Sequence, residues 1–392
     1  MTFLIPSLWS PSMRNCRRYC FRVIGAALLC AIAHSTVWAG GPVDLDRGIA
    51  PHNPQQPQVA VDAQGSIHVV YGVGDLARYR RSDDGGKSFT KPVDLPSAHD
   101  MSLGMRRGPR IAVLDKSICV SVIGGKQGKG RDGDLLAMRS VDGGKTWVGP
   151  VQVNDTADSA REGLHAMSVG LKGEMCCVWL DLRTGNTEVM SSVSTDGGST
   201  WGKNVLVYKS PDGSVCECCH PSAAIDSRGR IHVQWRNAVN GARDIYVATS
   251  TDGGKTFGKA SKLGTGSWAL DACPMDGGAI AVVAGGKLAS AWRRDKTVFL
   301  SLEGEREERG LGVGEQPWIA ATEAGPFVVW LKKRNDVAYL LTPGSKSPIE
   351  LASHAADPVI AAGPNGRGPV VAAWERRDGK NYTVQCQVVA DK

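Results

Sequence analysis

The chain has 392 residues, which exceeds the usual size of one domain, but all-β rings can reach this length as a single unit. Its 48 glycines and 11 tryptophans, with only 22% charged residues, argue against a helical bundle and against disorder, and favour many short strands joined by tight turns. The formal net charge of +7 comes with no stripe of lysine and arginine interleaved with aromatic residues, so no nucleic-acid partner is expected.

The first residues have the pattern of an export signal. An apolar run over 23–32 is followed by Val37-Trp38-Ala39, a small-residue cleavage site. The basic residues before the run are Arg14, Arg17, Arg18 and Arg22. We expect a signal peptide at 1–39 and one mature domain at 40–392, periplasmic or secreted. Because the run is shorter than the roughly 18 residues of a membrane helix, no stable membrane span is expected.

Four copies of one octapeptide follow, and their starts are 58, 54 and 56 residues apart. They begin at Ser82, Ser140, Ser194 and Ser250. A regular period of this length indicates stacked or radial units, and Asp-Gly-Gly is turn chemistry because glycine supplies positive φ. Each copy is therefore predicted to be a hairpin turn closed by an aromatic residue.

The pattern Ser-x-Asp-x-Gly-x-(Thr/Ser)-(Trp/Phe) is the Asp box, and the chain resembles the bacterial neuraminidase repeat (BNR) proteins of the sialidase superfamily over roughly residues 42–390. The resemblance implies a β-propeller of four-stranded blades with Asp boxes in rim turns. It also implies an arginine triad for a substrate carboxylate, a tyrosine nucleophile with a glutamate partner, and an aspartate acid/base.

A longer repeat of two apolar strands around a glycine-containing turn extends beyond the boxes. It occurs at 58–71, 110–122, 167–179, 222–235, 278–292, 318–330 and 359–374. These modules predict seven blades, with the six of sialidases as the alternative. The segment 41–45 is similar to the predicted fourth strands at 91–95 and 149–153, so we expect the N-terminal strand to complete the last blade and close the ring.

Loops that enter the inner strands and loops between the second and third strands should share one face of such a ring. Arginines gather in these loops and can offer bidentate forks to an anion. We assign them as ligand-binding: Arg110, Arg183, Arg236, Arg243 and Arg293. Candidate catalytic carboxylates are Asp181 and Asp276, with Glu162 as a further candidate. Alternatively, the arginines only pair with neighbouring aspartates in the scaffold.

The sialidase set itself is incomplete in this chain. No Phe/Tyr-Arg-Ile-Pro segment is present, since 108–111 reads Gly-Pro-Arg-Ile, and the tyrosines fall on predicted strands. We therefore predict a sialidase-like propeller with an arginine-lined pocket for a small anionic ligand or glycan. Whether it is a glycosidase stays open.

Cysteines supply an alternative function in the same loops. Cys216-Glu217-Cys218-Cys219-His220 and Cys273 precede inner strands of consecutive modules, so their side chains should meet near the channel mouth. They can form a disulfide, or a soft site for copper or zinc built from Cys216, Cys218, Cys219, His220 and Cys273. Cys216-x-x-Cys219-His220 also matches haem c attachment, but a loop would have to house a porphyrin and Cys218 would be unneeded. The alternative is thus a periplasmic metal- or redox-linked protein.

Overall fold

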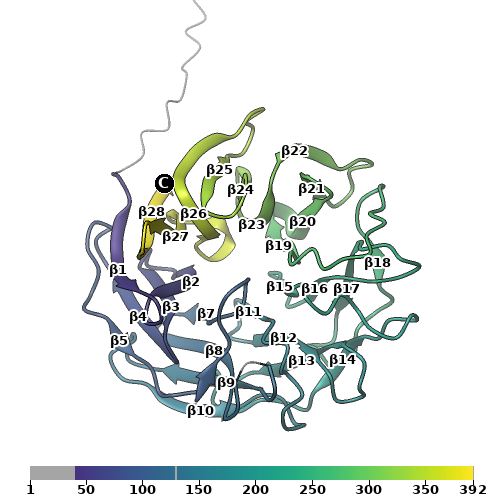
Figure 1. The fold of residues 1–392 in the computed structure, drawn as a ribbon, viewed down its shortest axis with the longest axis horizontal. Coiled ribbons are helices and arrows are strands. Elements are labelled where there is room, and N and C mark those ends of the chain that lie inside the picture. Colours follow the sequence, from purple (N-terminus) through teal and green to yellow (C-terminus); the bar gives the residue numbers. More distant parts are fainter. Residues whose placement is uncertain (1–39, 129, 392) are drawn as a thin grey trace, which may run out of the picture. The chain divides into compact units, whose positions relative to one another are not determined.

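The computed structural model describes residues 40–128 and 130–391, so the predicted signal peptide at 1–39 lies outside the described part. Within these residues the regular structure is β-strand, apart from two single 3-10 turns, η1 (Ala284–Gly286) and η2 (Pro364–Gly366). The strands form sheets arranged around a common centre, which is the architecture of a β-propeller (Figure 1). No helix of the described residues has the length and apolar character needed to cross a membrane.

Five sheets are antiparallel blades whose four strands pair in chain order. They contain β2 (Pro54–Val61), β3 (Ile67–Val73), β4 (Leu76–Ser82) and β5 (Val93–Asp94); β7 (Arg110–Leu114), β8 (Ser117–Gly125), β9 (Asp134–Ser140) and β10 (Val148–Gln152); β11 (His165–Val169), β12 (Met175–Asp181), β13 (Glu188–Ser194) and β14 (Val205–Tyr208); β15 (Ser222–Ile225), β16 (Ile231–Arg236), β17 (Ile245–Ser250) and β18 (Ser261–Lys262); and β19 (Ala279–Val283), β20 (Lys287–Arg294), β21 (Thr297–Leu302) and β22 (Arg309–Val313). The short strand β6 (Asp100–Met101) adds to the second blade by pairing with β8.

The sixth sheet has seven strands in the order β1-β28-β27-β26-β25-β24-β23. These are β1 (Val43–Ile49), β23 (Glu315–Thr322), β24 (Gly325–Leu331), β25 (Asp336–Leu341), β26 (Ile349–Ala362), β27 (Val370–Asp378) and β28 (Asn381–Ala390). The 14-residue strand β26 pairs with β25 through its first half and with β27 through its second half. The prediction of seven separate blades is therefore not confirmed, because no turn divides the sixth and seventh modules.

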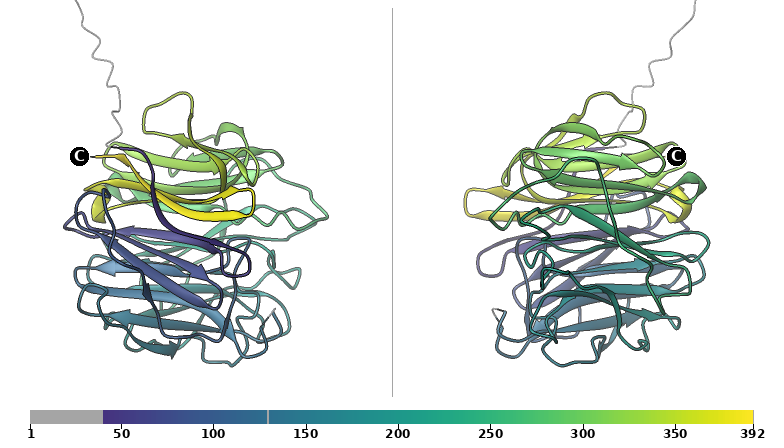
Figure 2. Two further views of the ribbon diagram at one scale, coloured as in Figure 1. Left: turned by 60° about the vertical axis from the view of Figure 1, so that its left-hand side comes forward. Right: turned by 90° about the vertical axis from the view of Figure 1, so that its right-hand side faces the viewer.

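The first strand of the chain completes this last sheet. β1 pairs antiparallel with β28, from Val43 opposite Cys386 to Ile49 opposite Asn381, as the likeness of 41–45 to other fourth strands predicted. Figure 2 shows β1 running alongside the C-terminal strands. The backbone groups along that edge of β28 are thus paired, which removes an open edge from the ring.

The Asp boxes form the predicted hairpin turns, each held by its own aspartate. In the third copy, the Asp196 carboxylate accepts hydrogen bonds from Ser194 Oγ, Thr200 N and Thr200 Oγ1 at 2.8, 2.9 and 2.6 Å. The Gly198 N–H donates to Ser194 Oγ at 2.9 Å. Aspartates of the other three copies accept the same bonds.

Large aromatic residues on the second strands fill the spaces between sheets. Trp179, Trp235, Trp330 and Trp374 are fully buried. Trp235 packs with Val178 of the preceding blade, and Trp179 packs with Cys119 of the blade before its own. Since each buried indole removes a large apolar area from water, these contacts hold neighbouring blades together.

The ring has two faces, defined by the direction of its inner strands. Inner strands begin at what we call the loop face, where the cysteine loop lies just before β15. They end at the box face, where the Asp-box turns also lie, because third strands run parallel to first strands in an antiparallel blade. The cysteine loop therefore lies on one face and the Asp-box turns lie on the other.

Candidate functional site

Three cysteines of one loop meet on the loop face. We call Cys216, Cys218 and Cys219 the cysteine triad; their sulfurs are 3.8 Å (216 to 218), 3.4 Å (216 to 219) and 4.0 Å (218 to 219) apart. A turn in which the Cys219 N–H donates to the Cys216 carbonyl brings them together. All three side chains are buried, and no cysteine of the described residues forms a disulfide.

A second loop, between β18 and β19, packs against the triad. Met275 contacts it, and the Asp276 N–H donates to the Cys219 sulfur at 3.3 Å. Cys273 is exposed, and the neighbouring Cys218 thiol raises the pKa of the Cys273 thiol to about 11. The two loops, which the sequence predicted to converge, therefore meet through sulfur.

Charge within the triad is uneven. Hydrogen bonds with the Cys218 and Cys219 thiols lower the pKa of Cys216 well below its usual range, and the positive charges of Arg236 and Arg243 act in the same direction. Burial raises the pKa of Cys219. Cys216 is thus the sulfur of the triad with the most thiolate character, which suits a nucleophile or a soft-metal ligand.

His220 belongs to the same loop but not to the cluster. Its ring stacks on the indole of Trp318, with centroids 5.5 Å apart and planes at 17°. Burial, with Arg106 and Arg110 nearby, holds the pKa of His220 well below its usual range. Haem c would need this imidazole to face a porphyrin, but the ring is buried against Trp318. These residues do not fit haem c.

Two of the predicted ligand-binding arginines are enclosed by backbone carbonyls. Arg110 donates to the carbonyls of His165, Gly108, Pro109 and Arg106. Arg236 donates to those of Asp276, Arg243 and Arg293 at 2.8, 2.5 and 2.8 Å. Both guanidinium groups are buried, so they tie loops together at the loop face.

The other three predicted arginines bind groups of their own blade or of a neighbouring strand or loop. Arg183 pairs with Asp181 and Asp155, each at 2.8 Å. Arg243 donates to the Leu270 carbonyl, and Arg293 donates to the Asp295 carbonyl and pairs with Glu315 at 3.4 Å. Arg110 lines one of the three cavities described below, and the other four arginines line none of these three.

The two predicted catalytic aspartates are both buried. Burial alone would raise the pKa of Asp181, but hydrogen bonds from Arg183, Trp179 and Ser159 outweigh it and hold that pKa below its usual range. Asp276 accepts a hydrogen bond from the Gln316 N–H at 2.6 Å. Both carboxylates are thus engaged by groups of the fold.

A cleft of about 600 Å³ opens between the first two blades on that face. Its charged residues are Asp75, Asp100, Arg107, Arg161 and Glu162. Burial raises the pKa of Glu162, and Arg107 Nε donates to the Glu162 carbonyl at 2.7 Å. The sequence had placed Glu162 among the candidate carboxylates. It had not singled out Arg107 or Arg161, although both lie in loops that enter inner strands.

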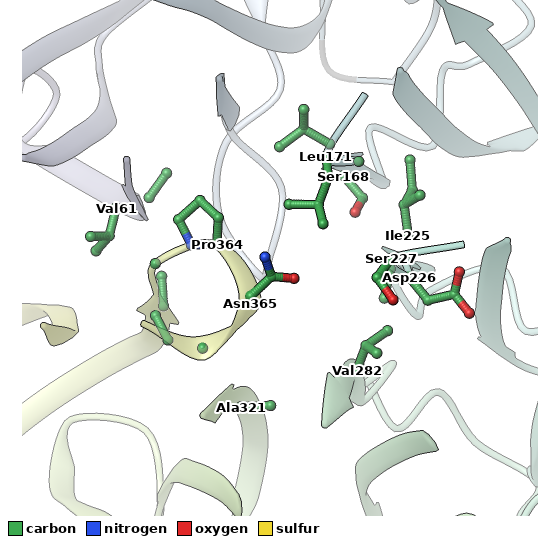
Figure 3. A pocket seen from close by; sticks show the side chains of 18 of the residues that line it. Val61, Ser168, Leu171, Ile225, Asp226, Ser227, Val282, Ala321, Pro364 and Asn365 are labelled. Atoms are coloured by element: carbon green, nitrogen blue, oxygen red, sulfur yellow. The ribbon is translucent and has the colours of Figure 1, made fainter. Parts of the chain in front are cut away.

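The centre of the ring contains a cavity of about 710 Å³ that opens on the box face. Figure 3 shows Val61, Leu171, Ile225 and Val282 around it, with Asn365 between them. A smaller cavity of about 250 Å³ lies deeper, beside Arg110 and Trp318. The lining of the larger cavity is mostly aliphatic, so it offers few groups for orienting a polar ligand.

Buried charges gather where the inner strands begin. Asp357 pairs with Arg334 at 2.6 Å and with Arg106 at 3.9 Å. Glu375 accepts hydrogen bonds from the backbone and side chain of Gln56. Burial, followed by the nearby charge of Asp357, raises the pKa of Glu375 to about 7. This cluster connects both ends of the chain around the channel.

Comparison with known proteins agrees with this architecture. Residues 122–310 match the family described as BNR repeat-like domain. Over these residues, just under half of the chain, the sequence is similar to BNR repeat proteins, and the radial sheets with their Asp-box turns have a β-propeller architecture. No curated protein matches the chain.

Solved structures with the same fold include carbohydrate-active enzymes. The α-L-arabinanase of Penicillium chrysogenum, complexed with arabinobiose, has a TM-score of 0.55 at 14% identity over 89% of this chain and 98% of that one. The GH93 α-L-arabinofuranosidase of Fusarium graminearum, also with arabinobiose, has a TM-score of 0.53 at 11% identity, over 89% of this chain and 98% of that one. A PL25 ulvan lyase bound to -[GlcA(1-4)Rha3S]- has a TM-score of 0.55 at 13% identity, over 89% of this chain and 96% of that one. At these identities the similarity concerns the fold.

Proposed function

We propose that this protein is an exported glycan-binding propeller whose ligand occupies the loop-face cleft. The observation that carries the proposal is the 600 Å³ cleft itself, in which the half-buried carboxyl group of Glu162 lies with Arg107 and Arg161. Carboxyl and guanidinium groups can hydrogen-bond saccharide hydroxyls, and arginine can in addition bind a carboxylate or sulfate. The glycan ligands of similarly folded enzymes support this class of ligand.

Glu162 is the residue of the cleft best suited to proton transfer. Because burial raises its pKa, it keeps a proton at higher pH than an exposed glutamate does, as a general acid requires. A protein that only binds a glycan, without cleaving it, needs no proton donor. We propose Glu162, in place of Asp181 and Asp276, as the proton donor if the protein cleaves its ligand.

Calorimetric titration with a glucuronate and sulfated-rhamnose oligosaccharide, and with arabinobiose as a neutral probe, tests the proposal. The anionic probe should bind, and Arg161→Ala should weaken it by about tenfold or more through loss of a charge-assisted contact. Glu162→Gln should keep binding but abolish any release of reducing ends. Glu174→Gln, a partly exposed glutamate in the β11–β12 turn outside the cleft, is the control. Failure of both probes to bind would reject the proposal.

Two further points accompany it. We propose counting the C-terminal sheet as two blades that share β26. Seven chain segments line the central cavity, because the last sheet supplies two of them and each other sheet supplies one.

We also propose export to the periplasm or beyond, supported by the basic and apolar pattern of residues 1–39. Proteolytic mapping of the mature N-terminus tests the export.

A second candidate function is a metal- or redox-linked role. It is favoured by the close approach of three buried sulfurs in the cysteine triad. A glycan cleft requires no such cluster, so the triad calls for an explanation of its own.

A further inference from the structure

We propose that the cysteine triad binds one Cu(I) ion through three sulfurs, and that Cys273 is the exposed thiol through which the ion enters. This site shares no residue with the cleft, so it stands or falls independently of the proposed glycan function.

The spacing of the sulfurs is the first argument. They lie 3.4 to 4.0 Å apart, whereas three ligands around an ion with metal–sulfur bonds of about 2.3 Å lie about 3.8–4.0 Å apart. A disulfide requires about 2.05 Å and joins only two sulfurs, which would leave the third thiol buried without a role. The triad is therefore close to the geometry of a three-sulfur site before any ion is added.

The type and number of ligands select the metal. Only Cys216, Cys218 and Cys219 among the described residues have ligand atoms that all lie within 4.8 Å of one another, and the thioether of Met275 packs against them. Structural zinc sites take four ligands, often including histidine, but His220 stacks on Trp318 instead. An all-sulfur set with a neighbouring thioether suits Cu(I).

The surroundings supply positive charge for an anionic cluster. Arg236 is buried, and its guanidinium donates only to carbonyl oxygens, with no carboxylate partner among the described residues. The same residue is joined to the triad, because its carbonyl accepts the Cys216 N–H and its Nε bonds the Asp276 carbonyl. A buried cation costs free energy unless opposite charge offsets it, and three thiolates around a monovalent ion carry that charge.

Cys273 connects the buried triad with solvent. It is exposed, and it belongs to the loop that packs on the triad through Met275 and the Asp276 N–H. An ion bound first at Cys273 can pass to Cys218 by ligand exchange, and each thiol that binds releases its proton to water. The Asp276 N–H on the Cys219 sulfur orients that ligand from the same loop.

The test uses the purified, reduced protein under anaerobic conditions and Cu(I) supplied as its bathocuproine disulfonate complex. The protein should remove one equivalent of Cu(I) from the chelator, and X-ray absorption should show three sulfur neighbours and no nitrogen. Cys216→Ser, Cys218→Ser and Cys219→Ser should each lower the affinity by more than about 100-fold, since even residues behind a ligand cost up to that factor. Cys386→Ser, a buried cysteine of β28, is the matched control.

The Cys273→Ala variant distinguishes entry of the ion from its binding. It should keep the equilibrium affinity of the triad for Cu(I) but slow the transfer of Cu(I) from the chelator. Circular dichroism checks that each variant is folded, and silver(I) titration provides a probe that needs no reductant. A disulfide within the triad after isolation without reductant, tighter retention of zinc than of Cu(I), or unchanged affinity in the triad variants would each overturn the proposal. So would loss of affinity in Cys273→Ala, because Cys273 would then be a fourth ligand.

Discussion

The Asp276 backbone N–H lies 3.3 Å from the sulfur of Cys219, although the two residues are 57 positions apart in the chain. This bond depends on a close approach of the two loops at Gly277, where a Cβ atom would lie only 1.8 Å from the His220 carbonyl oxygen. Gly277→Ala should therefore push the loops apart. We expect about 2 kcal/mol or more of lost stability together with weakened Cu(I) binding, measured by denaturant unfolding and chelator competition. Gly310→Ala, where a Cβ meets only ordinary contacts at 3.7 Å, should change neither.

The pairing of β1 with β28 predicts that the N-terminal strand stabilises the whole ring. Deleting residues 40–47 removes most of β1 and leaves the backbone groups of β28 unpaired. Stability should fall by more than about 2 kcal/mol, and the protein should aggregate through the new edge. Thermal unfolding and light scattering against a chain that starts at residue 40 measure this. An unchanged melting temperature would mean that β1 does not close the ring.

The Asp-box turns should support stability without taking part in binding. Asp196→Ala removes three hydrogen bonds at the box face and should cost about 1–3 kcal/mol while leaving glycan and copper binding intact. The exposed neighbour Thr195 is the control position. Loss of binding in a normally stable Asp196→Ala variant would contradict the separation of the two faces.

The pH dependence of the same residue has a defined sign. Hydrogen bonds from the Thr200 hydroxyl and the Thr200 N–H lower the pKa of Asp196 to about 2. A carboxyl group with a lowered pKa in the folded state stabilises above its unfolded value and loses that effect as the pH falls through about 2. The stability cost of Asp196→Ala should thus shrink between pH 5 and pH 2.

Glu375 should show the opposite sign. Its pKa is raised to about 7, so the folded state binds a proton more tightly than the unfolded state, and stability is lost as the pH rises from about 4.5 through 7. Glu375→Gln resembles the protonated form and removes this loss. The stability of the variant relative to the native protein should therefore improve by about 2 kcal/mol between pH 5 and pH 8. Glu323→Gln, on an exposed glutamate, should show no such trend, and a flat difference for Glu375→Gln would exclude the raised pKa.

The local patterns of the sequence were sufficient for the turns and for the order of the strands. The Asp boxes, the place of residues 41–45 and the convergence of the cysteine loops follow from the repeat, because equal positions in consecutive modules lie side by side in a ring. Each of these features is encoded within one module or its neighbour.

The partners of the arginines could not be read in the same way. Arg110 and Arg236 suggested a ligand pocket because arginine forks bind anions, but their donors are satisfied by carbonyls of loops about 55 and 40 residues away. Backbone oxygens leave no signal in a sequence, so a free arginine and an enclosed one look alike. The cleft was missed for a related reason: Asp75 and Glu162 come from different modules, and only the packing of blades brings them to one opening.

The continuous strand β26 restricts how this chain can change in length during evolution. Each Asp-box blade is bounded by its own loops, so a copy can be duplicated or lost by recombination between two turns. Residues 349–362 belong to two halves of one sheet, and a break within them would destroy pairing on both sides. Relatives with a different number of repeats should therefore differ among the blades that carry Asp boxes, while the segment from β23 to β28 is inherited as a block.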